Sequence, residues 1–404
     1  MQLSADPDFH YEILRVMSLA PYQGADLGEV LVAAQKIQPK DVESFYGAFN
    51  GLATRVDKTA RAMDARKKPI SARQHFFKAA TYYRSADFFL HGNGSDPRID
   101  SLWEKHLAAF NSAIALLPTP GRRISLGASN DSFTIPAIFY GCGMPGPRPT
   151  LILGNGYDGA QEEMYHVIGQ AALERGINVM TYEGPGQPSV RREQNLGFIP
   201  DWEKVVTPVI DHLLTRPEVD PRAIGLLGYS MGGYLAPRAA AFDHRLAAVL
   251  AVDGVYDYGA ANLDKFPERM RAIFKAGDAT LFNRLVEQRL ADPAATTAAV
   301  WGVQQGLWSF NVETPFEWMT KLEDYTLASV LPKIRTPVFV AQAERDDVIP
   351  GQSRLLAEKL GELATHHVFE SVDGAAYHCS VGASVLQNHV LLDWFEDVLQ
   401  RRSR

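Results

Sequence analysis

Leu226-Leu227-Gly228-Tyr229-Ser230-Met231-Gly232-Gly233 is the stretch that decides the fold. The apolar run before it, 223–227, predicts a buried strand, and the small-residue run after it, 231–242, predicts a helix. A serine between two glycines at a strand-to-helix turn is typical of a nucleophile elbow, where neighbouring backbones crowd together. We therefore expect Ser230 to be a strained nucleophile at the edge of a parallel sheet, with the Met231 N–H directed at the atom under attack.

Strands alternate with helices on both sides of this turn. Such alternation predicts an α/β fold with a mostly parallel sheet, the α/β-hydrolase fold once the elbow is included. We expect strands at 124–126, 133–140, 150–153, 177–182, 224–227, 246–252, 337–342 and 367–372, the first two as an antiparallel pair. The helices expected among them are 161–175, 201–214, 351–360 and 383–399.

Two regions depart from this alternation and read as helical. We divide the chain into a helical N-terminal domain at 1–120, a first part of the core at 121–257, a helical cap insertion at 258–332 and a second part of the core at 333–404. Within the first region, Asp26 and Glu29 have the spacing of a capping box before a helix at 27–37. The cap is expected to close over Ser230.

A serine hydroxyl is a weak nucleophile at neutral pH and needs an adjacent base. His378 follows the last expected strand and so belongs at the same sheet edge as Ser230, whereas His366 and His367 begin that strand. The acid belongs after the preceding strand, where the D-x-x-x-P pattern ending at Pro350 selects Asp346, with Asp347 as the alternative. The order serine, acid, histidine is that of an α/β-hydrolase triad.

An oxyanion hole needs two backbone N–H groups. Met231 supplies one, and the loop after the third expected strand, 154–159, supplies the other. We favour Tyr157 as that donor, with Asp158 as the alternative. The remaining candidates for substrate contact are Asp158, Asp253, Asp257, Trp301 and Trp308, with Trp318 as a further apolar group of the cap. No metal site and no cofactor are expected.

Composition narrows the range of partners. The 404 residues carry a net charge of −7 with both signs mixed along the chain, which argues against nucleic-acid and membrane-surface binding. Two cysteines, Cys142 and Cys379, do not form a disulfide framework and fit a reducing compartment, so a cytoplasmic protein is expected. The oligomeric state stays open, with a homodimer as one alternative.

Several motifs beyond the elbow make the whole chain similar to one branch of the α/β-hydrolases. It resembles the fungal polyketide chain-shortening hydrolases of the yellowish-green pigment type and, more distantly, the bacterial 2,6-dihydroxypseudooxynicotine hydrolase. One departure is Gly186-Gln187-Pro188, where many relatives read Pro-Gly-Gln-Gly. The motifs that carry the resemblance are 154–159 followed by 161–165, 182–187, 228–234, and the N-terminal segment 9–30.

The resemblance implies hydrolysis of a C–C bond beside a carbonyl through an acyl-enzyme, in secondary metabolism, with an aromatic polyketide as the small-molecule substrate. It also implies a triad of Ser230, Asp346 and His378. The bacterial relative uses a further carboxylate near its substrate, for which Asp253 and Asp257 are candidates, although structural capping is the alternative for each. Other readings of the same triad are an ester or lactone hydrolase and a cyclase or intramolecular acyl transferase.

Overall fold

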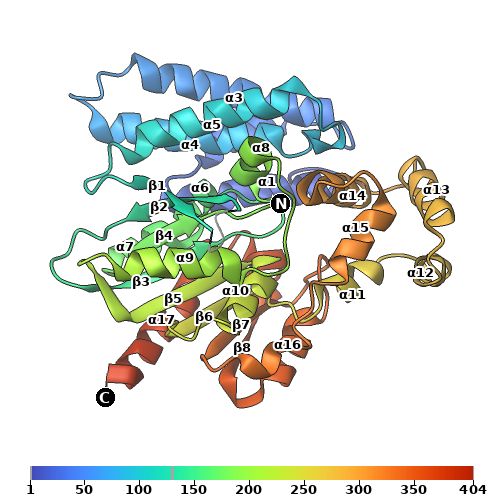
Figure 1. The fold of residues 1–404 in the computed structure, drawn as a ribbon. Helices are drawn as coiled ribbons and strands as arrows, with labels where there is room; N and C mark the ends of the chain where they lie inside the picture. The colour runs from blue at the N-terminus through green and yellow to red at the C-terminus, as the bar shows by residue number, and fades with distance from the viewer. Residues whose placement is uncertain (1, 129–131, 404) are drawn as a thin grey trace.

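An eight-stranded sheet forms the centre of the computed structural model, which describes residues 2–128 and 132–403 (Figure 1). The strands lie in the order β1-β2-β4-β3-β5-β6-β7-β8, with β1–β2 and β2–β4 antiparallel and every other neighbouring pair parallel. This arrangement confirms the expected α/β fold with a mostly parallel sheet. The strands are β1 (Arg122–Gly127), β2 (Thr134–Tyr140), β3 (Arg148–Gly154), β4 (Asn178–Tyr182), β5 (Val219–Tyr229), β6 (Ala248–Val252), β7 (Val338–Ala343) and β8 (Ala364–Phe369).

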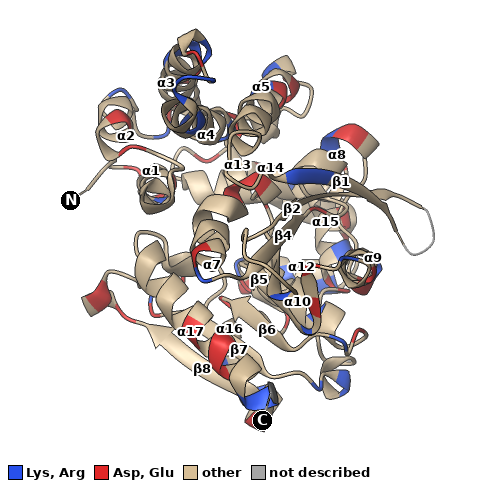
Figure 2. Cartoon of the chain, turned by 90° about the vertical axis from the view of Figure 1, so that its left-hand side faces the viewer, with Lys and Arg blue, Asp and Glu red and all other residues tan. Residues whose placement is uncertain are grey.

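The central strands are covered on both faces. Every residue of β4 and β6 is buried, as expected for parallel strands between two helical layers. Figure 2 shows α7 and α17 on one side of the sheet and α9 and α10 on the other. The helices of the core are α6 (Gln161–Met164), α7 (Gln170–Glu174), α8 (Pro188–Gln194), α9 (Glu203–Leu214), α10 (Gly232–Ala240), α16 (Gln352–Leu360) and α17 (Ser384–Ser403).

Five helices precede the sheet, and Figure 1 shows α3, α4 and α5 stacked above it. Asp6 begins α1, because its carboxylate accepts from the Asp8 and Phe9 N–H groups, and Phe9, Ile13 and Val16 are buried on one face of that helix. One face of α3 is buried as well, with Phe45, Phe49, Leu52 and Val56. The five helices are α1 (Pro7–Ser18), α2 (Leu27–Ala34), α3 (Val42–Ala62), α4 (Pro69–Asp87) and α5 (Pro97–Ile114).

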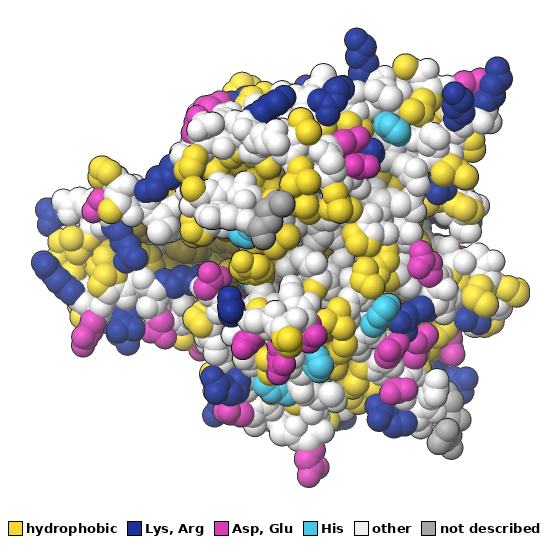
Figure 3. Space-filling view, turned by 180° about the vertical axis from the view of Figure 1, so that it is seen from behind, with side chains coloured by type: hydrophobic (Ala, Val, Ile, Leu, Met, Phe, Trp, Pro, Cys, Tyr) yellow, Lys and Arg dark blue, Asp and Glu magenta, His cyan; other side chains and the backbone are white. Residues whose placement is uncertain are grey.

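The chain between β6 and β7 is helical, as the sequence predicts. Its helices are α11 (Tyr258–Leu263), α12 (Glu268–Lys275), α13 (Ala279–Leu290), α14 (Thr297–Phe310) and α15 (Pro315–Leu322). In Figure 1 this region projects from the body to the right of the sheet. Figure 3, seen from behind, shows a hollow lined by apolar side chains between this projection and the body. The division of the chain into four units remains a prediction.

Two local expectations are wrong, and a third element, the helix at 161–175, is present but is not α-helical throughout. The last strand is β8 at Ala364–Phe369, not 367–372, because its register with β7 begins at Ala364 and 371–373 form a 3₁₀ turn. The helix expected at 161–175 contains a π-helical segment, Tyr165–Gly169, between α6 and α7. Asp26 does cap α2, but the Glu29 carboxylate binds Lys78 and Tyr82 of α4, so no capping box forms.

Among the described residues, no helix is long and apolar enough to cross a membrane. Figure 2 shows basic and acidic residues interspersed over the elements in view, in keeping with the mixed charge of the sequence.

Candidate active site

The nucleophile elbow forms between β5 and α10 as the sequence predicts. Ser230 has a φ of 60°, in the left-handed region that side chains rarely adopt. Its N–H donates to the Val252 carbonyl at 3.0 Å, which fixes the turn against the end of β6. A Cβ on Gly228 would lie 1.9 Å from the Gly232 carbonyl oxygen, so a side chain is excluded there. The fold therefore holds the half-buried Ser230 at the carboxyl edge of the sheet.

His378 lies between Ser230 and Asp346. Its Nε2 is 2.8 Å from the Ser230 Oγ, and its Nδ1 is 2.9 Å from the Asp346 Oδ1. The three side chains come from the ends of β5, β7 and β8, which meet at one edge because these strands are parallel. Asp346 Oδ1 also accepts from the Val348 and Ile349 N–H groups, which fixes the carboxylate.

The environment of this pair favours the charged forms. Burial alone would lower the pKa of His378, but the nearby carboxylates of Asp346 and Asp253 outweigh it and raise that pKa well above its ordinary value. Burial would raise the pKa of Asp346, yet the imidazole and two backbone N–H groups lower it. Asp347 is exposed, whereas the Asp346 side chain is only 6% exposed. The geometry favours Asp346 over Asp347 as the partner of His378.

The other histidines near β8 lie away from this arrangement. His366 pairs with Val340 in the middle of the strand, and its Nε2 is 3.0 Å from the Gln342 Oε1. His367 stacks edge-on against Phe369.

The loop after β3 lies directly against the elbow. A Cβ on Gly156 would lie 2.6 Å from the Tyr229 carbonyl oxygen and 2.9 Å from the Met231 nitrogen. Among the described residues, neither the Tyr157 N–H nor the Met231 N–H donates to a protein acceptor. Both N–H groups are therefore available to an acceptor, and their role as an oxyanion hole remains a prediction.

Helix α14 fixes Tyr157 at both ends of the residue. Gln305 of α14 donates from Nε2 to the Tyr157 carbonyl at 3.1 Å, and the Tyr157 hydroxyl donates to the Gly302 carbonyl at 2.8 Å. Gln187, from the core, donates to the Asn155 carbonyl at 2.9 Å. The departure at Gly186-Gln187-Pro188 fits this contact of Gln187 with the loop. Pro188 is a suitable first residue for α8, and Gln187 precedes it as the N-cap.

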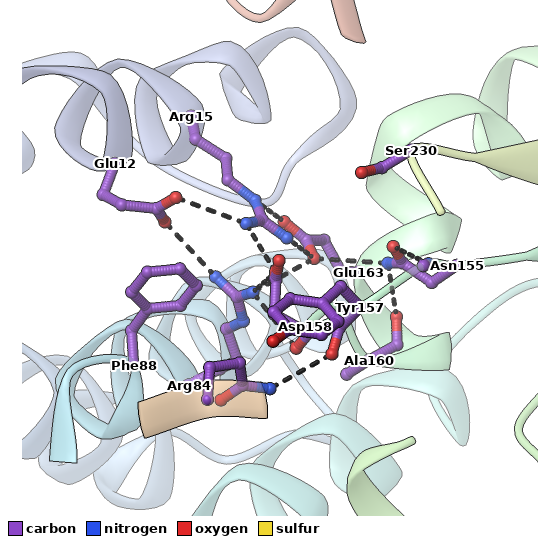
Figure 4. A network of polar contacts seen from close by, with 12 residues as sticks. Glu12, Arg15, Arg84, Phe88, Asn155, Tyr157, Asp158, Ala160, Glu163 and Ser230 are labelled. Carbon is purple, nitrogen blue, oxygen red and sulfur yellow. Dashed lines mark hydrogen bonds and ion pairs between the residues drawn. The ribbon is translucent and has the colours of Figure 1, made fainter. Parts of the chain in front are cut away.

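The N-terminal helices fix the next residue of the same loop (Figure 4). Asp158 Oδ1 accepts from Arg15 of α1 at 2.8 Å and from Arg84 of α4 at 3.0 Å. Arg15 also forms a bidentate pair with Glu163, with both contacts at 2.7 Å. Glu12 is the fifth residue of this network. Burial raises the pKa of its carboxyl group to about 7, because the effect of burial outweighs the lowering effect of the two arginines. Two arginines therefore face three carboxyl groups in this buried network, and the one on Glu12 is partly protonated at neutral pH.

The five candidates for substrate contact lie in different surroundings. Asp158 is engaged by the two arginines, and Asp257 accepts from the Ala260 N–H as the N-cap of α11. Asp253 lies behind His378, buried, with Ala343 and Cys379 N–H groups donating to its carboxylate. These placements favour structural or positioning roles for the three acids over direct contact with substrate.

The tryptophans of α14 and α15 also differ from one another. Trp301 is half-buried, stacks on Phe88 with ring centroids 4.7 Å apart, and meets Tyr157 edge-on at 6.1 Å. Trp308 is buried and stacks on His91 with ring centroids 4.0 Å apart. Trp301 thus contacts the loop after β3 through Tyr157, while Trp308 packs against the chain at His91. Trp318 is buried beside Gly306.

Among the described residues, one group has enough potential ligands close together to hold a metal ion: Asp253, His378 and Cys379. Burial raises the pKa of the Cys379 thiol to about 12, and the Asp253 carboxylate already accepts two backbone N–H groups. Metal binding needs a thiolate and free carboxylate oxygens, so the environment disfavours an ion here.

Sequence reasoning missed Arg15, Arg84 and Gln305. Each lies on a helix far from the elbow in the chain, and Arg84 and Gln305 belong to none of the motifs singled out in the sequence. Arg15, Glu163 and Gln187 did carry a signal, because all three lie in motifs that support the family resemblance.

The comparisons with known proteins agree with this geometry. The profile described as "Alpha/beta hydrolase family" matches residues 151–382, more than half of the chain. The chain therefore belongs to the alpha/beta hydrolase family. Hydrolase LUC6 of Fusarium sp is 29% identical over 409 residues, covering 96% of each chain, and 20-hydroxy-prefusarin hydrolase FUS2 of Gibberella moniliformis is 29% identical over 406 residues, again covering 96% of each.

Among solved structures, the 2,6-dihydroxy-pseudo-oxynicotine hydrolase matches with a TM-score of 0.75 and 22% identity over 95% of each chain. That likeness shows a shared fold. The resemblance to fungal hydrolases and to this hydrolase, expected from the motifs, is confirmed.

Proposed function

We propose that this protein is a serine hydrolase that cleaves a C–C bond beside a carbonyl in an aromatic polyketide through an acyl-enzyme. The observation that carries the proposal is the contact chain Ser230 Oγ to His378 Nε2 at 2.8 Å and His378 Nδ1 to Asp346 Oδ1 at 2.9 Å. In this arrangement the histidine takes the serine proton while the carboxylate fixes its tautomer and stabilises its charged form.

The proposed reaction proceeds in two halves. Ser230 Oγ bonds to the ketone carbon as its proton passes to His378 Nε2, and the oxyanion is held by the Tyr157 and Met231 N–H groups. The C–C bond then breaks, its electron pair leaves with an enolate- or phenolate-type carbon, and the imidazolium returns the proton to that carbon. Water, deprotonated by His378, attacks the ester to Ser230 and releases a carboxylic acid and the free serine.

Two features support C–C cleavage over simple ester hydrolysis. A carbon leaving group must be stabilised and protonated out of contact with bulk water. Both helical regions contact the catalytic edge: the Tyr11 hydroxyl of α1 donates to the His378 carbonyl at 3.1 Å, and α14 binds Tyr157. The second support is the resemblance to hydrolases known for this reaction.

The test is incubation of the purified enzyme with an acylated naphthol or a naphthopyrone in ¹⁸O-labelled water. C–C cleavage places one heavy oxygen in the released acid and leaves a shortened carbon skeleton. An isomeric product without label would identify a cyclase. Fast turnover of nitrophenyl esters, with no cleavage of ketones, would identify an esterase. Ser230→Ala is the matched control, since it removes the nucleophile from the same scaffold.

A further inference from the structure

Two carboxylates, not one, face the outer nitrogen of His378. Asp346 Oδ1 is 2.9 Å from the His378 Nδ1, and Asp253 Oδ2 is 3.1 Å from the same atom. Both acids are withdrawn from water, with side chains 6% and 1% exposed. One N–H group cannot donate two full hydrogen bonds, so the proton of Nδ1 lies between two acceptors.

The topology of the sheet explains this convergence. Asp253 is the first residue after β6, and Asp346 follows β7, the neighbouring parallel strand. Successive strand ends at one edge therefore supply the nucleophile, one acid, a second acid and the histidine. The backbone of Asp253 is held in place by its surroundings. Its φ is 48°, and a residue other than glycine keeps that conformation only when the surrounding structure imposes it.

Two backbone N–H groups fix the Asp253 carboxylate toward His378. Its Oδ1 accepts from the Ala343 N–H at 2.8 Å, and its Oδ2 accepts from the Cys379 N–H, the residue after the histidine. Asp253 Oδ2, the oxygen that faces the His378 Nδ1, is thus also the oxygen that binds the backbone next to His378. The two backbone contacts give Asp253 a structural role. Its distance to the His378 Nδ1 also allows it to orient the imidazole.

We propose that Asp253 is a second acid for His378, a positioning residue that shares the Nδ1–H with Asp346. This inference rests on the proposed function, since it assigns a partner to the proposed base. Either carboxylate orients the ring and stabilises the imidazolium, so loss of Asp346 leaves the histidine with a working partner. The acid function at this site is therefore divided between the ends of β6 and β7.

The groups that face His378 come from several elements. They are Asp253 after β6, Asp346 after β7, Tyr11 on α1, Tyr258 on α11, and Cys379 beside it in the chain. Burial raises the pKa of both tyrosines and of the thiol above their ordinary values, so these three stay neutral near neutral pH. The two aspartates are the anions among these five groups.

The test compares kcat for the wild type, Asp346→Ala, Asp253→Asn and the double variant. In a triad with a single acid, removing that acid costs on the order of 10⁴ in kcat. With two acids, we expect each single change to cost about tenfold and the double variant to fall by on the order of 10⁴, far beyond the product of the two. If Asp346→Ala alone falls to the level of the double variant, the inference is overturned.

A second readout separates an acid from a residue that only holds the loop. Asp253→Asn keeps the size of the side chain but removes a negative charge, so the pKa of His378 read from the pH dependence of kcat/KM should move to lower pH. Asp257→Asn, which caps α11 nearby, is the matched control and should leave that pKa unchanged. An unchanged pKa in Asp253→Asn would overturn the inference.

Two single variants separate a failure of this inference from a failure to fold and from a failure of the proposed function. Should Asp253→Asn fail to fold, Asp346→Ala decides alone: activity within about 10² of wild type supports the inference, and a loss of about 10⁴ overturns it. Ser230→Ala tests the proposed function separately, because a folded Ser230→Ala enzyme with normal turnover would remove the serine mechanism whatever the acids do.

Discussion

Removing the side-chain amide of Gln305 is expected to slow the chemical step without weakening the binding of substrate. Gln305 is buried on α14 and donates to the Tyr157 carbonyl at 3.1 Å. That carbonyl belongs to the same residue whose N–H is proposed to hold the oxyanion. Without the bond from Gln305, the loop is free to reorient, and the N–H loses its alignment with the oxyanion.

The expected loss of kcat can be estimated from the contribution of one oxyanion donor. Deleting one oxyanion donor outright costs about 10²–10³ in kcat. Gln305→Leu leaves the donor present but less well aligned, so we expect a loss of about 10- to 100-fold in kcat, that is, about 1.4–2.7 kcal/mol in the barrier. The change also leaves the Tyr157 carbonyl and the His91 Nδ1, 2.6 Å from the Gln305 Oε1, without this partner. Each buried group left unpaired costs about 1–3 kcal/mol of stability.

The assay measures kcat and KM separately, together with the affinity of a trifluoromethyl ketone that forms a tetrahedral adduct with Ser230. Misalignment of the oxyanion hole should weaken that adduct in proportion to the loss of kcat while KM stays near its wild-type value. Thermal unfolding shows whether each variant is folded at the assay temperature. Gln304→Leu is the matched control, since the neighbouring amide of Gln304 lies against Gly92.

Two results would refute this reasoning. One is a folded Gln305→Leu enzyme with wild-type kcat, which would show that α14 does not set the loop. The other is a rise in KM with unchanged kcat, which would make Gln305 a binding residue. Gln305→Glu gives an independent check, because a carboxylate oxygen facing the Tyr157 carbonyl should be at least as harmful as leucine.

The remaining predictions concern the triad and the buried charge network. Ser230→Ala should lower turnover by on the order of 10³-fold or more and abolish labelling by a fluorophosphonate, because the covalent route is lost; persistent labelling would point to another nucleophile. Asp346→Ala should lower kcat more than Asp347→Ala, which removes an exposed side chain and should stay within about twofold of wild type; the reverse ranking would transfer the acid role to Asp347. The base form of His378 is neutral and its pKa is raised, so kcat/KM should rise with pH through a midpoint above the ordinary histidine value; a midpoint below that value would contradict the carboxylate contacts. Burial raises the pKa of Glu12 to about 7, above its unfolded value of 4.5, so the folded state binds more protons between these values and stability falls as pH rises through them. Glu12→Gln should flatten that fall in thermal unfolding scans from pH 4 to 8, and an unchanged slope would assign it to other groups.

The alternation of strands and helices and the elbow could be predicted from the sequence because their signals are local. Ser230 sits in a fixed pattern with Gly228 and Gly232, and the crowding that demands those glycines arises within one turn. His378 and Asp346 were found by their order and by their places after successive strands, since parallel strands end at one edge. The mostly parallel sheet followed from the alternation of strands and helices and agrees with the structure. The choice of Asp346 over Asp347 remains a prediction that the contact with His378 supports.

The misplaced elements show where local signals fail. The bounds of β8 depend on its register with β7, which is set by pairing and not by the residues of β8 themselves. Glu29 has the right spacing for a capping box, but Lys78 and Tyr82 of α4 offer its carboxylate better partners. In both cases a neighbour distant in the chain outweighs the local preference.

Sequence alone determined the family, and it predicted the chemistry from a serine at an elbow, a histidine and an acid in hydrolase order. Tertiary structure decided how that chemistry is supported. Asp253 was a candidate for substrate contact or for structural capping, and it lies 3.1 Å from the His378 Nδ1. Gln305 and Arg15 fix a loop that lies about 150 residues away from each of them. Such contacts join helices and strand ends that no spacing rule relates, because only packing of the two helical regions on the sheet brings them together.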